Sequence, residues 1–233
     1  MKRIAIVTAS GVGKRFPGTC KKQFRTIAGR PVLAYAIDNF VHNKEIDGIV
    51  VTVPYNEIEQ TITQLHALYQ NSDIQVVEGG ETRQKSVLRA LNTLSLDTNI
   101  VLIHDGVRPF VNEAELMEML RICYEVDAVI PVHKVKNTIK EVSENKVVRT
   151  LFRNSLVEVY TPQIFRYDMI LKYHRLADQQ GLSFTDDASI IEHYGMPVYT
   201  YETEQVSLKI TDESDFNVAK IIIENNIADK KVR

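Results

Sequence analysis

The chain has 233 residues, of which 44% are hydrophobic and 25% are charged, and its formal net charge at pH 7 is −2. This composition is typical of a folded globular protein and argues against a disordered chain. No block of like charge stands out, so we expect neither a nucleic-acid partner nor a membrane-surface partner. The two cysteines, Cys20 and Cys123, are far apart and suggest neither a disulfide framework nor a zinc site.

Apolar residues do not form a long uninterrupted run anywhere in the sequence. No stretch approaches the length that a transmembrane helix needs, and we therefore expect no membrane span. The apolar run that follows Met1 is short and leads directly into a Gly-rich segment, which argues against a signal peptide. We accordingly expect a cytoplasmic protein.

Short β-branched runs alternate with longer amphipathic stretches. In chain order we predict a strand at 3–8, a helix at 31–40, a strand at 48–53, a helix at 56–69, a strand at 74–77, a helix at 82–94, a strand at 100–103, a helix at 113–124 and a strand at 128–132. Strands and helices in turn form βαβ units. We therefore predict an α/β fold with a Rossmann-like, mostly parallel sheet covered by helices on both faces.

The pattern changes at about residues 134–155, where polar and apolar residues alternate and residues 143–146 have the composition of a turn. This alternation predicts a protruding, two-stranded β-arm. An isolated hairpin is marginally stable in water, so we expect the arm to pack on a partner, most simply a second subunit. Later helices are predicted at 167–178, 187–194 and 212–226, and strands at 198–201 and 207–210. We expect a single domain over residues 1–233, with the arm as an insertion.

The turn after the first strand is rich in glycine and in cations. Gly11 and Gly13 fit part of a dinucleotide fingerprint, but Phe16 replaces its third glycine, and the Walker A pattern also fails. The segment carries four cations and no acid: Lys14, Arg15, Lys21 and Lys22. Ligands of open α/β sheets bind beyond the carboxyl ends of the strands, and glycine lets backbone N–H groups approach phosphate oxygens. The turn therefore predicts a polyphosphate site.

Two other strand ends carry polar groups. Asp105 and Arg108 follow the fourth strand, where a single carboxylate suits Mg²⁺ held on substrate phosphates and a guanidinium suits another phosphate. Gly79 and Gly80 follow the third strand and would let the backbone approach a flat ligand such as a base. Thr82 follows the glycine pair and could equally be a helix N-cap as a residue of the ligand site. Thr185 or Asp187 could likewise be the cap of a later helix.

The order and spacing of six short motifs resemble the sugar-alcohol-phosphate cytidylyltransferases, most closely the 2-C-methyl-D-erythritol 4-phosphate cytidylyltransferase family. The motifs are G-x-G-x-R followed by K-Q, then G-G-x-x-R-x-x-S, H-D-x-x-R-P, T-P-Q, T-D-D-A-S and L-K-I-T, and they span about residues 3–225. The resemblance implies that CTP and a polyol phosphate give a CDP-polyol and pyrophosphate, with a divalent cation such as Mg²⁺. For the methylerythritol branch, the resemblance implies a place in isoprenoid precursor synthesis.

The resemblance also implies roles for individual residues. The catalytic cations would be Arg15, Lys22 and Lys209. The substrate-binding residues on the nucleotide side would be Ala9, Ser10, Gly11, Gly13, Gly80, Glu81, Arg83, Ser86 and Gly106. Asp105 would lie beside the ribose, the metal and the second substrate, and Arg108 and Thr161 would line the polyol-phosphate site. In the family the arm crosses to the second subunit of a homodimer, and Thr138 and Arg153 match the arm positions that bind the neighbour's polyol phosphate.

Three other interpretations stay open on the sequence alone. The relative that acts on ribitol 5-phosphate has nearly the same motifs, although T-D-D-A-S favours the methylerythritol branch. A nucleotide-binding protein without activity is a second possibility, against which the intact Arg15, Lys22, Asp105 and Lys209 speak. The last possibility is an NAD-dependent oxidoreductase, which the Gly-rich turn suggests. The absence of the third glycine of the dinucleotide fingerprint disfavours it.

Overall fold

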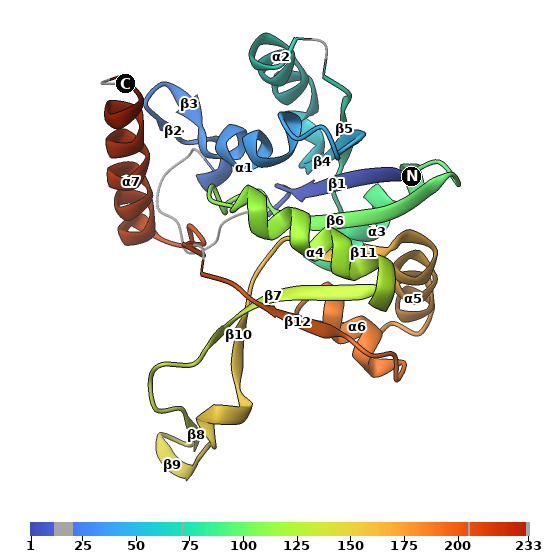
Figure 1. Ribbon diagram of the computed structural model, residues 1–233, viewed down its shortest axis with the longest axis vertical. Coiled ribbons are helices and arrows are strands. Elements are labelled where there is room, and N and C mark those ends of the chain that lie inside the picture. The colour runs from blue at the N-terminus through green and yellow to red at the C-terminus, as the bar shows by residue number, and fades with distance from the viewer. Residues whose placement is uncertain (12–20, 71, 205, 232–233) are drawn as a thin grey trace.

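The structure is a computed structural model that describes residues 1–11, 21–70, 72–204 and 206–231 (Figure 1). Its first half alternates parallel strands with helices. The strands are β1 (Lys2–Thr8), β4 (Gly48–Val53), β5 (Ile74–Glu78) and β6 (Thr98–Asp105). The helices are α1 (Val32–Val41), α2 (Ile58–Leu68), α3 (Arg83–Thr93) and α4 (Glu113–Val126). The short strands β2 (Thr26–Ile27) and β3 (Arg30–Pro31) form a small separate pair.

The second half adds strands of both directions to the same sheet. They are β7 (Ala128–Lys134), β10 (Val157–Val159), β11 (Gln163–Arg166) and β12 (Tyr199–Glu202). The main path is β10-β7-β11-β6-β1-β4-β5, and β12 pairs in parallel with β7. The remaining helices are α5 (Tyr167–Gln179), α6 (Asp187–His193) and α7 (Glu213–Lys231). The predicted Rossmann-like α/β fold with a mostly parallel sheet is confirmed.

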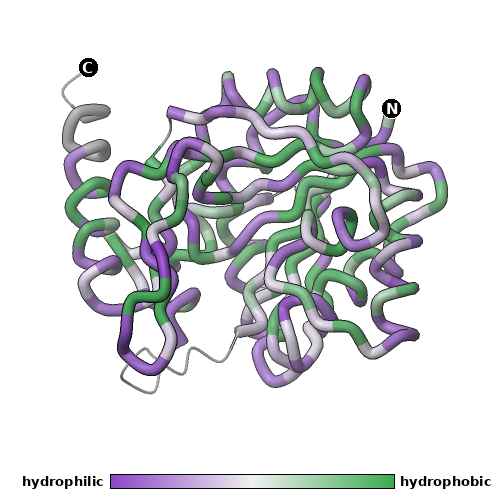
Figure 2. The backbone as a smooth tube through the Cα atoms, turned by 90° about the horizontal axis from the view of Figure 1, so that it is seen from below, coloured by the Kyte–Doolittle hydropathy of each residue, from purple (hydrophilic) through white to green (hydrophobic). Residues whose placement is uncertain are grey.

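Helices cover both faces of the sheet because the central strands are apolar on both faces. In β1, Ala5 and Val7 belong to the buried cluster that includes residues of α1, α2 and α4. Ile4 and Ile6, which point to the opposite face, belong to the cluster that includes residues of α3, α5 and α6. Side chains of a strand alternate between the two faces, so an unbroken apolar run requires cover on each. In Figure 2 the hydrophobic stretches run through the middle of the molecule.

The β-arm is confirmed as a hairpin of β8 (Lys140–Ser143) and β9 (Lys146–Thr150), which pair in antiparallel fashion. Glu144 and Asn145 form the two-residue turn with φ values of 48° and 62°, as tight hairpins require. Figure 1 shows the arm projecting away from the main sheet. It leaves apolar side chains in solvent; Phe152, for example, is 72% exposed. The short helical turn Arg153–Ser155 follows β9.

Two details of the predicted elements are wrong. The strand predicted at 207–210 is absent, and that segment runs irregularly between β12 and α7. Its backbone contacts the turn after β6 and does not pair with a strand: Ile210 N donates to Val107 O at 3.0 Å. Conversely, β10 and β11 were not predicted, because each is a short segment whose strand character comes from antiparallel pairing with distant strands. None of the described helices is both long and apolar enough to cross a bilayer.

Candidate active site

The carboxyl ends of the parallel strands open into a cavity of about 450 Å³. Most of the lining comes from the ends of strands and the residues that follow them: residues 8–11 at β1, residues 54–55 after β4, residues 78–83 at β5, and Asp105 and Val107 at the end of β6. The predicted residues that line this first cavity are Ala9, Ser10, Gly11, Lys22, Gly80, Glu81, Arg83, Asp105 and Lys209. The fold therefore brings most of the predicted nucleotide site to one edge of the sheet.

The glycine pair after β5 is required by close packing. A Cβ atom on Gly79 would lie 2.2 Å from the Cβ of Ser10, and one on Gly80 would lie 2.5 Å from the Cβ of Lys85. The buried Ser86 hydroxyl ties the two loops together: it accepts from Gly80 N at 2.9 Å and lies 2.7 Å from the Ser10 hydroxyl. Ser86 therefore holds the cavity wall from behind and does not line it.

Gln23, the glutamine of the K-Q motif, is a positioning residue that the motif alone does not reveal. Its side chain is buried, and its amide nitrogen donates to Ala9 O at 2.6 Å and to Gly11 O at 3.1 Å. It thereby fixes the start of the Gly-rich turn next to Lys22. Nothing in a lone glutamine signals this role, because the contact depends on the short helical turn Lys22–Phe24 lying against the residues that follow β1.

A second cavity of about 440 Å³ adjoins the first. It is lined by Arg108 and Thr161, both predicted, and by Tyr160, Gln163, Thr185, Asp186, Ser189 and Glu192. Arg83, Asp105 and Lys209 line both cavities. The arrangement offers two adjoining sites that share one carboxylate, one guanidinium and one ammonium group.

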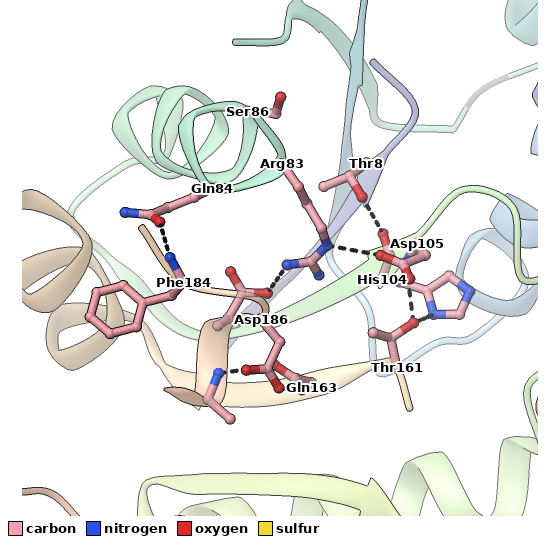
Figure 3. Close-up of polar contacts among 12 residues, drawn as sticks. Thr8, Arg83, Gln84, Ser86, His104, Asp105, Thr161, Gln163, Phe184 and Asp186 are labelled. Carbon is pink, nitrogen blue, oxygen red and sulfur yellow. Dashed lines mark hydrogen bonds and ion pairs between the residues drawn. The ribbon is translucent and has the colours of Figure 1, made fainter. Parts of the chain in front are cut away.

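Asp105 is the centre of this shared wall. Its Oδ1 lies 2.9 Å from Arg83 Nε, and its Oδ2 lies 2.8 Å from Lys209 Nζ and 3.3 Å from Arg108 Nε. Burial raises the pKa of Asp105, but the positive charges of Arg83, Lys209 and Arg108 outweigh burial and hold that pKa well below its usual range. The carboxylate is therefore ionised at neutral pH. Figure 3 shows Arg83 reaching toward Asp105 beside His104 and Thr161.

His104 and Thr161 support the end of β6. The Thr161 hydroxyl lies 3.0 Å from His104 Nδ1 and accepts from Asp105 N at 3.2 Å. Burial lowers the pKa of His104 to about 4 despite its hydrogen bond to the Arg108 carbonyl, so the ring is neutral at pH 7. A neutral ring accepts the Thr161 proton at Nδ1 and donates from Nε2 to Arg108 O at 2.9 Å. His104 is therefore a packed strand-end histidine.

The remaining predicted residues lie elsewhere. Arg15 and Gly13 lie outside the described residues. Gly106 is buried against β1, with its N–H donating to Thr8 O at 2.9 Å. Thr138 and Arg153 lie together at a separate hollow of the arm, away from Asp105 in the same chain.

Two predicted helix caps can be checked. Thr82 caps α3, accepting from Lys85 N at 3.1 Å. The cap of α6 is Asp186 and neither Thr185 nor Asp187, because Asp186 forms a reciprocal capping box with Ser189. Asp187 instead points into the interior, where it pairs with Arg83.

The predicted metal ligand has suitable chemistry. Mg²⁺ in nucleotide enzymes takes one or two carboxylates together with substrate phosphates and water. Asp105 is an ionised carboxylate in the wall between the cavities, which fits that donor set, although Lys209 Nζ already contacts its Oδ2 at 2.8 Å. The described residues hold no cluster of three or more metal-ligating side chains. A metal here would therefore depend on substrate oxygens for most of its ligands.

Comparison with known proteins identifies the family. The family model for 2-C-methyl-D-erythritol 4-phosphate cytidylyltransferase matches residues 3–225. The enzyme of that name from Clostridium novyi is 38% identical over 226 residues, covering 96% of this chain and 97% of that protein. The one from Carboxydothermus hydrogenoformans is 37% identical and covers 93% of each chain.

Solved structures show the same fold. The structure of 4-diphosphocytidyl-2C-methyl-D-erythritol synthase from Anaerococcus prevotii superposes with a TM-score of 0.84 at 29% identity, covering 96% of both chains. The 2-C-methyl-D-erythritol 4-phosphate cytidylyltransferase of Francisella tularensis gives a TM-score of 0.79 at 29% identity, covering 94% of this chain and 98% of that one. On the full-length family match and these relatives, the chain belongs to the 2-C-methyl-D-erythritol 4-phosphate cytidylyltransferase family.

Proposed function

We propose that this nucleotidyltransferase transfers the cytidylyl group of CTP to 2-C-methyl-D-erythritol 4-phosphate, in isoprenoid precursor synthesis. A phosphate oxygen of the polyol phosphate attacks the α-phosphorus of CTP, a new P–O bond forms, and the bond to the leaving pyrophosphate breaks. The observation that carries the proposal is the pair of adjoining cavities with Asp105 and Lys209 in their common wall. Two substrates bound in them would meet at these two residues.

The first cavity suits CTP. Its glycine-bounded wall of Ala9, Ser10, Gly11, Gly80 and Glu81, supported from behind by Ser86, would surround the base. Gly106 would lie near the ribose. Lys22 lines the same cavity, and with Arg15 and Gly13 from the preceding turn it would contact the triphosphate. Cations placed at developing charge stabilise the transition state of phosphoryl and nucleotidyl transfer more than acid–base groups do.

The second cavity suits the polyol phosphate. Arg108 and Lys209 would bind its phosphate, and Thr161 lines the same cavity. The nucleophile is already anionic, so these groups mainly reduce its repulsion from the phosphates of CTP and orient it for in-line attack. Asp105 would hold Mg²⁺, which would supply positive charge to offset the negative charge of the phosphates.

The arm supports a homodimer. Every residue of its two strands is exposed, including Val142, Val147 and Val148, so a hairpin of this kind gains stability from a partner surface. In the proposed dimer, Thr138 and Arg153 would reach the second cavity of the neighbouring subunit. We further propose that residues 1–233 form a single nucleotidyltransferase domain with the arm at about 134–155 as an insertion, and that the enzyme is cytoplasmic.

Three alternatives are weaker. Ribitol 5-phosphate as the acceptor is not favoured, because the family model and the similar curated proteins carry the methylerythritol name. A protein without activity is disfavoured by the shared Asp105–Lys209 wall and by the presence of Lys22 in the first cavity. An NAD-dependent oxidoreductase is disfavoured by membership of a transferase family.

The deciding experiment measures the release of pyrophosphate from CTP in the presence of Mg²⁺. Methylerythritol 4-phosphate is the acceptor in one reaction and ribitol 5-phosphate in a parallel one. We expect clear preference for the methylerythritol substrate. Preference for ribitol 5-phosphate would contradict the proposed acceptor, and no release with either acceptor would contradict the proposed activity. Omitting Mg²⁺ and adding a chelator tests the metal, and turnover should then be lost.

A further inference from the structure

A line of paired charged and polar groups runs from the helical layer of α3, α5 and α6 to the wall between the cavities. His174 Nε2 lies 3.1 Å from Asp187 Oδ1, Asp187 Oδ2 lies 2.7 Å from Arg83 Nη1, and Arg83 Nε lies 2.9 Å from Asp105 Oδ1. Arg83 and Asp105 border the two cavities described above, whereas Asp187 and His174 border neither of them. The proposed reaction assigns no role to Asp187 or His174.

Asp187 is an unusual carboxylate because it is 1% exposed and yet ionised. Burial raises its pKa, but Arg83 and the His174 hydrogen bond outweigh burial and lower it. An ionised carboxylate only accepts hydrogen bonds, so His174 must donate to it from Nε2. A buried ion pair is a poor way to gain stability, since packed apolar side chains of similar volume usually do as well. Its position against a functional arginine suggests another role.

Arg83 is shared between two carboxylates, and each binds a different nitrogen. Its side chain is 26% exposed, whereas the side chains of Asp105 and Asp187 are 7% and 1% exposed. With Asp187 present, Asp105 receives one nitrogen of the Arg83 guanidinium at Oδ1, and its Oδ2 contacts Lys209 and Arg108. Without the charge of Asp187, Arg83 would be drawn more strongly to Asp105, and the carboxylate would turn away from Lys209 and the substrates.

We propose that Asp187, supported by His174, is a positioning residue for the transfer reaction, and that it acts through Arg83 to keep Asp105 correctly placed between the two substrates. This inference rests on the proposed function. It assigns to the second aspartate of the T-D-D-A-S motif a task other than capping a helix, which Asp186 performs.

The test compares steady-state kinetics of the wild type, Asp187→Asn, Arg83→Lys and the double variant. Small displacements of reacting groups typically cost up to about 100-fold in rate, so we expect Asp187→Asn to lower kcat/KM for both substrates on the order of 10- to 100-fold. Because Asp187 acts through Arg83, adding Asp187→Asn to the Arg83→Lys variant should lower kcat/KM by less than about threefold relative to Arg83→Lys alone. Equal losses in both backgrounds, or unchanged kinetics in folded Asp187→Asn, would overturn the inference.

Asp38→Asn is the matched control. Asp38 is a partly buried carboxylate that pairs with Arg30 at 2.8 Å and accepts from Tyr69, and it borders neither cavity. Its replacement should lower the melting temperature and leave both KM values unchanged. If Asp38→Asn and Asp187→Asn change the kinetics to the same extent, Asp187 is merely structural.

A second pair of variants serves if Asp187→Asn does not fold. His174→Gln keeps a donor toward Asp187, whereas His174→Leu removes it. We expect His174→Leu to raise both KM values and His174→Gln to keep them near those of the wild type. Identical kinetics of the two variants would overturn the role of His174.

Equilibrium binding of CTP to the wild type and to Asp187→Asn separates this inference from the proposed function. If the wild type releases no pyrophosphate with either acceptor, weaker CTP binding by the variant still supports the inference, and equal binding contradicts it.

Discussion

The ammonium group of Lys209 lies 2.8 Å from Oδ2 of Asp105. The pairing is produced by the contacts that flank Lys209 in its irregular segment. Ser207 O accepts from Arg108 Nη1 at 3.0 Å, and Ile210 N donates to Val107 O at 3.0 Å. The segment before α7 is therefore fastened to the turn after β6 on both sides of the lysine. This attachment places the cation in the wall that the two cavities share.

Replacing Lys209 with Met should remove a cation from the site of phosphate attack. Asp105 would keep Arg83 and Arg108 as partners and stay ionised. Loss of one such donor typically costs about 3–4 kcal/mol, so we expect kcat to fall on the order of 100-fold or more. Pyrophosphate release at saturating CTP measures this. Lys220→Met on α7, which removes an exposed lysine, should retain wild-type turnover, and an equal loss in both variants would contradict the assignment.

Lys22→Ala should lower turnover on the order of 100-fold or more with the fold retained, because one cation on the triphosphate is lost. The neighbouring Lys21 provides the comparison, since its amine pairs with Glu57 at 2.9 Å and it does not line the first cavity. Lys21→Ala should cost much less. Wild-type turnover of Lys22→Ala at saturating CTP would refute the proposed role of this lysine.

Ser86→Ala should weaken CTP binding without touching the nucleotide. The substitution leaves the N–H of Gly80 without its acceptor and breaks the link to Ser10. An unsatisfied buried donor costs about 1–3 kcal/mol, so KM for CTP should rise on the order of tenfold. Thr93→Ala removes a hydroxyl from the other end of the same helix, where it donates to Ala90 O, and should leave KM unchanged. A normal KM for Ser86→Ala would argue against the base site.

The proposed homodimer predicts subunit complementation. Arg153→Ala and Lys209→Ala proteins should each be nearly inactive alone, because each subunit's site would need its own Lys209 and the partner's Arg153. Mixing equal amounts under exchanging conditions makes half of the dimers hybrid with one intact site each, so activity should recover to about a quarter of the wild type. No recovery, or a monomer by light scattering, would contradict the role of the arm.

His104 makes unfolding depend on pH between its folded pKa of about 4 and its ordinary value of 6.5. In that window the unfolded chain binds a proton that the folded chain does not, so stability rises with pH. We expect the free energy of unfolding to be about 2 kcal/mol lower at pH 5 than at pH 7. Urea titrations at both values measure it. His104→Gln should lose most of this difference, and an undiminished slope in that variant would assign it to other groups.

Most of the fold followed from local patterns. The runs at β1, β4 and β6 are apolar on both faces, so they indicate buried parallel strands, and the turn composition at Glu144 and Asn145 indicates the arm. The pairing of β11 between β6 and β7 was missed, because four residues carry little periodicity and their partners lie far away in the sequence. For the same reason, a strand-like pattern at 207–210 proved irregular.

The sequence by itself determined the alternating βαβ order, the glycine and lysine content of the first turn, and the residues that the family motifs mark, because these properties depend on near neighbours along the chain. Only the tertiary structure decided which of those residues meet. Asp105, Arg83 and Lys209 come together because β6, α3 and the segment before α7 converge on one sheet edge, whereas Thr138 and Arg153 lie on the arm, away from that edge. Burial and charge, which set the state of Asp105, Asp187 and His104, arise only from that convergence.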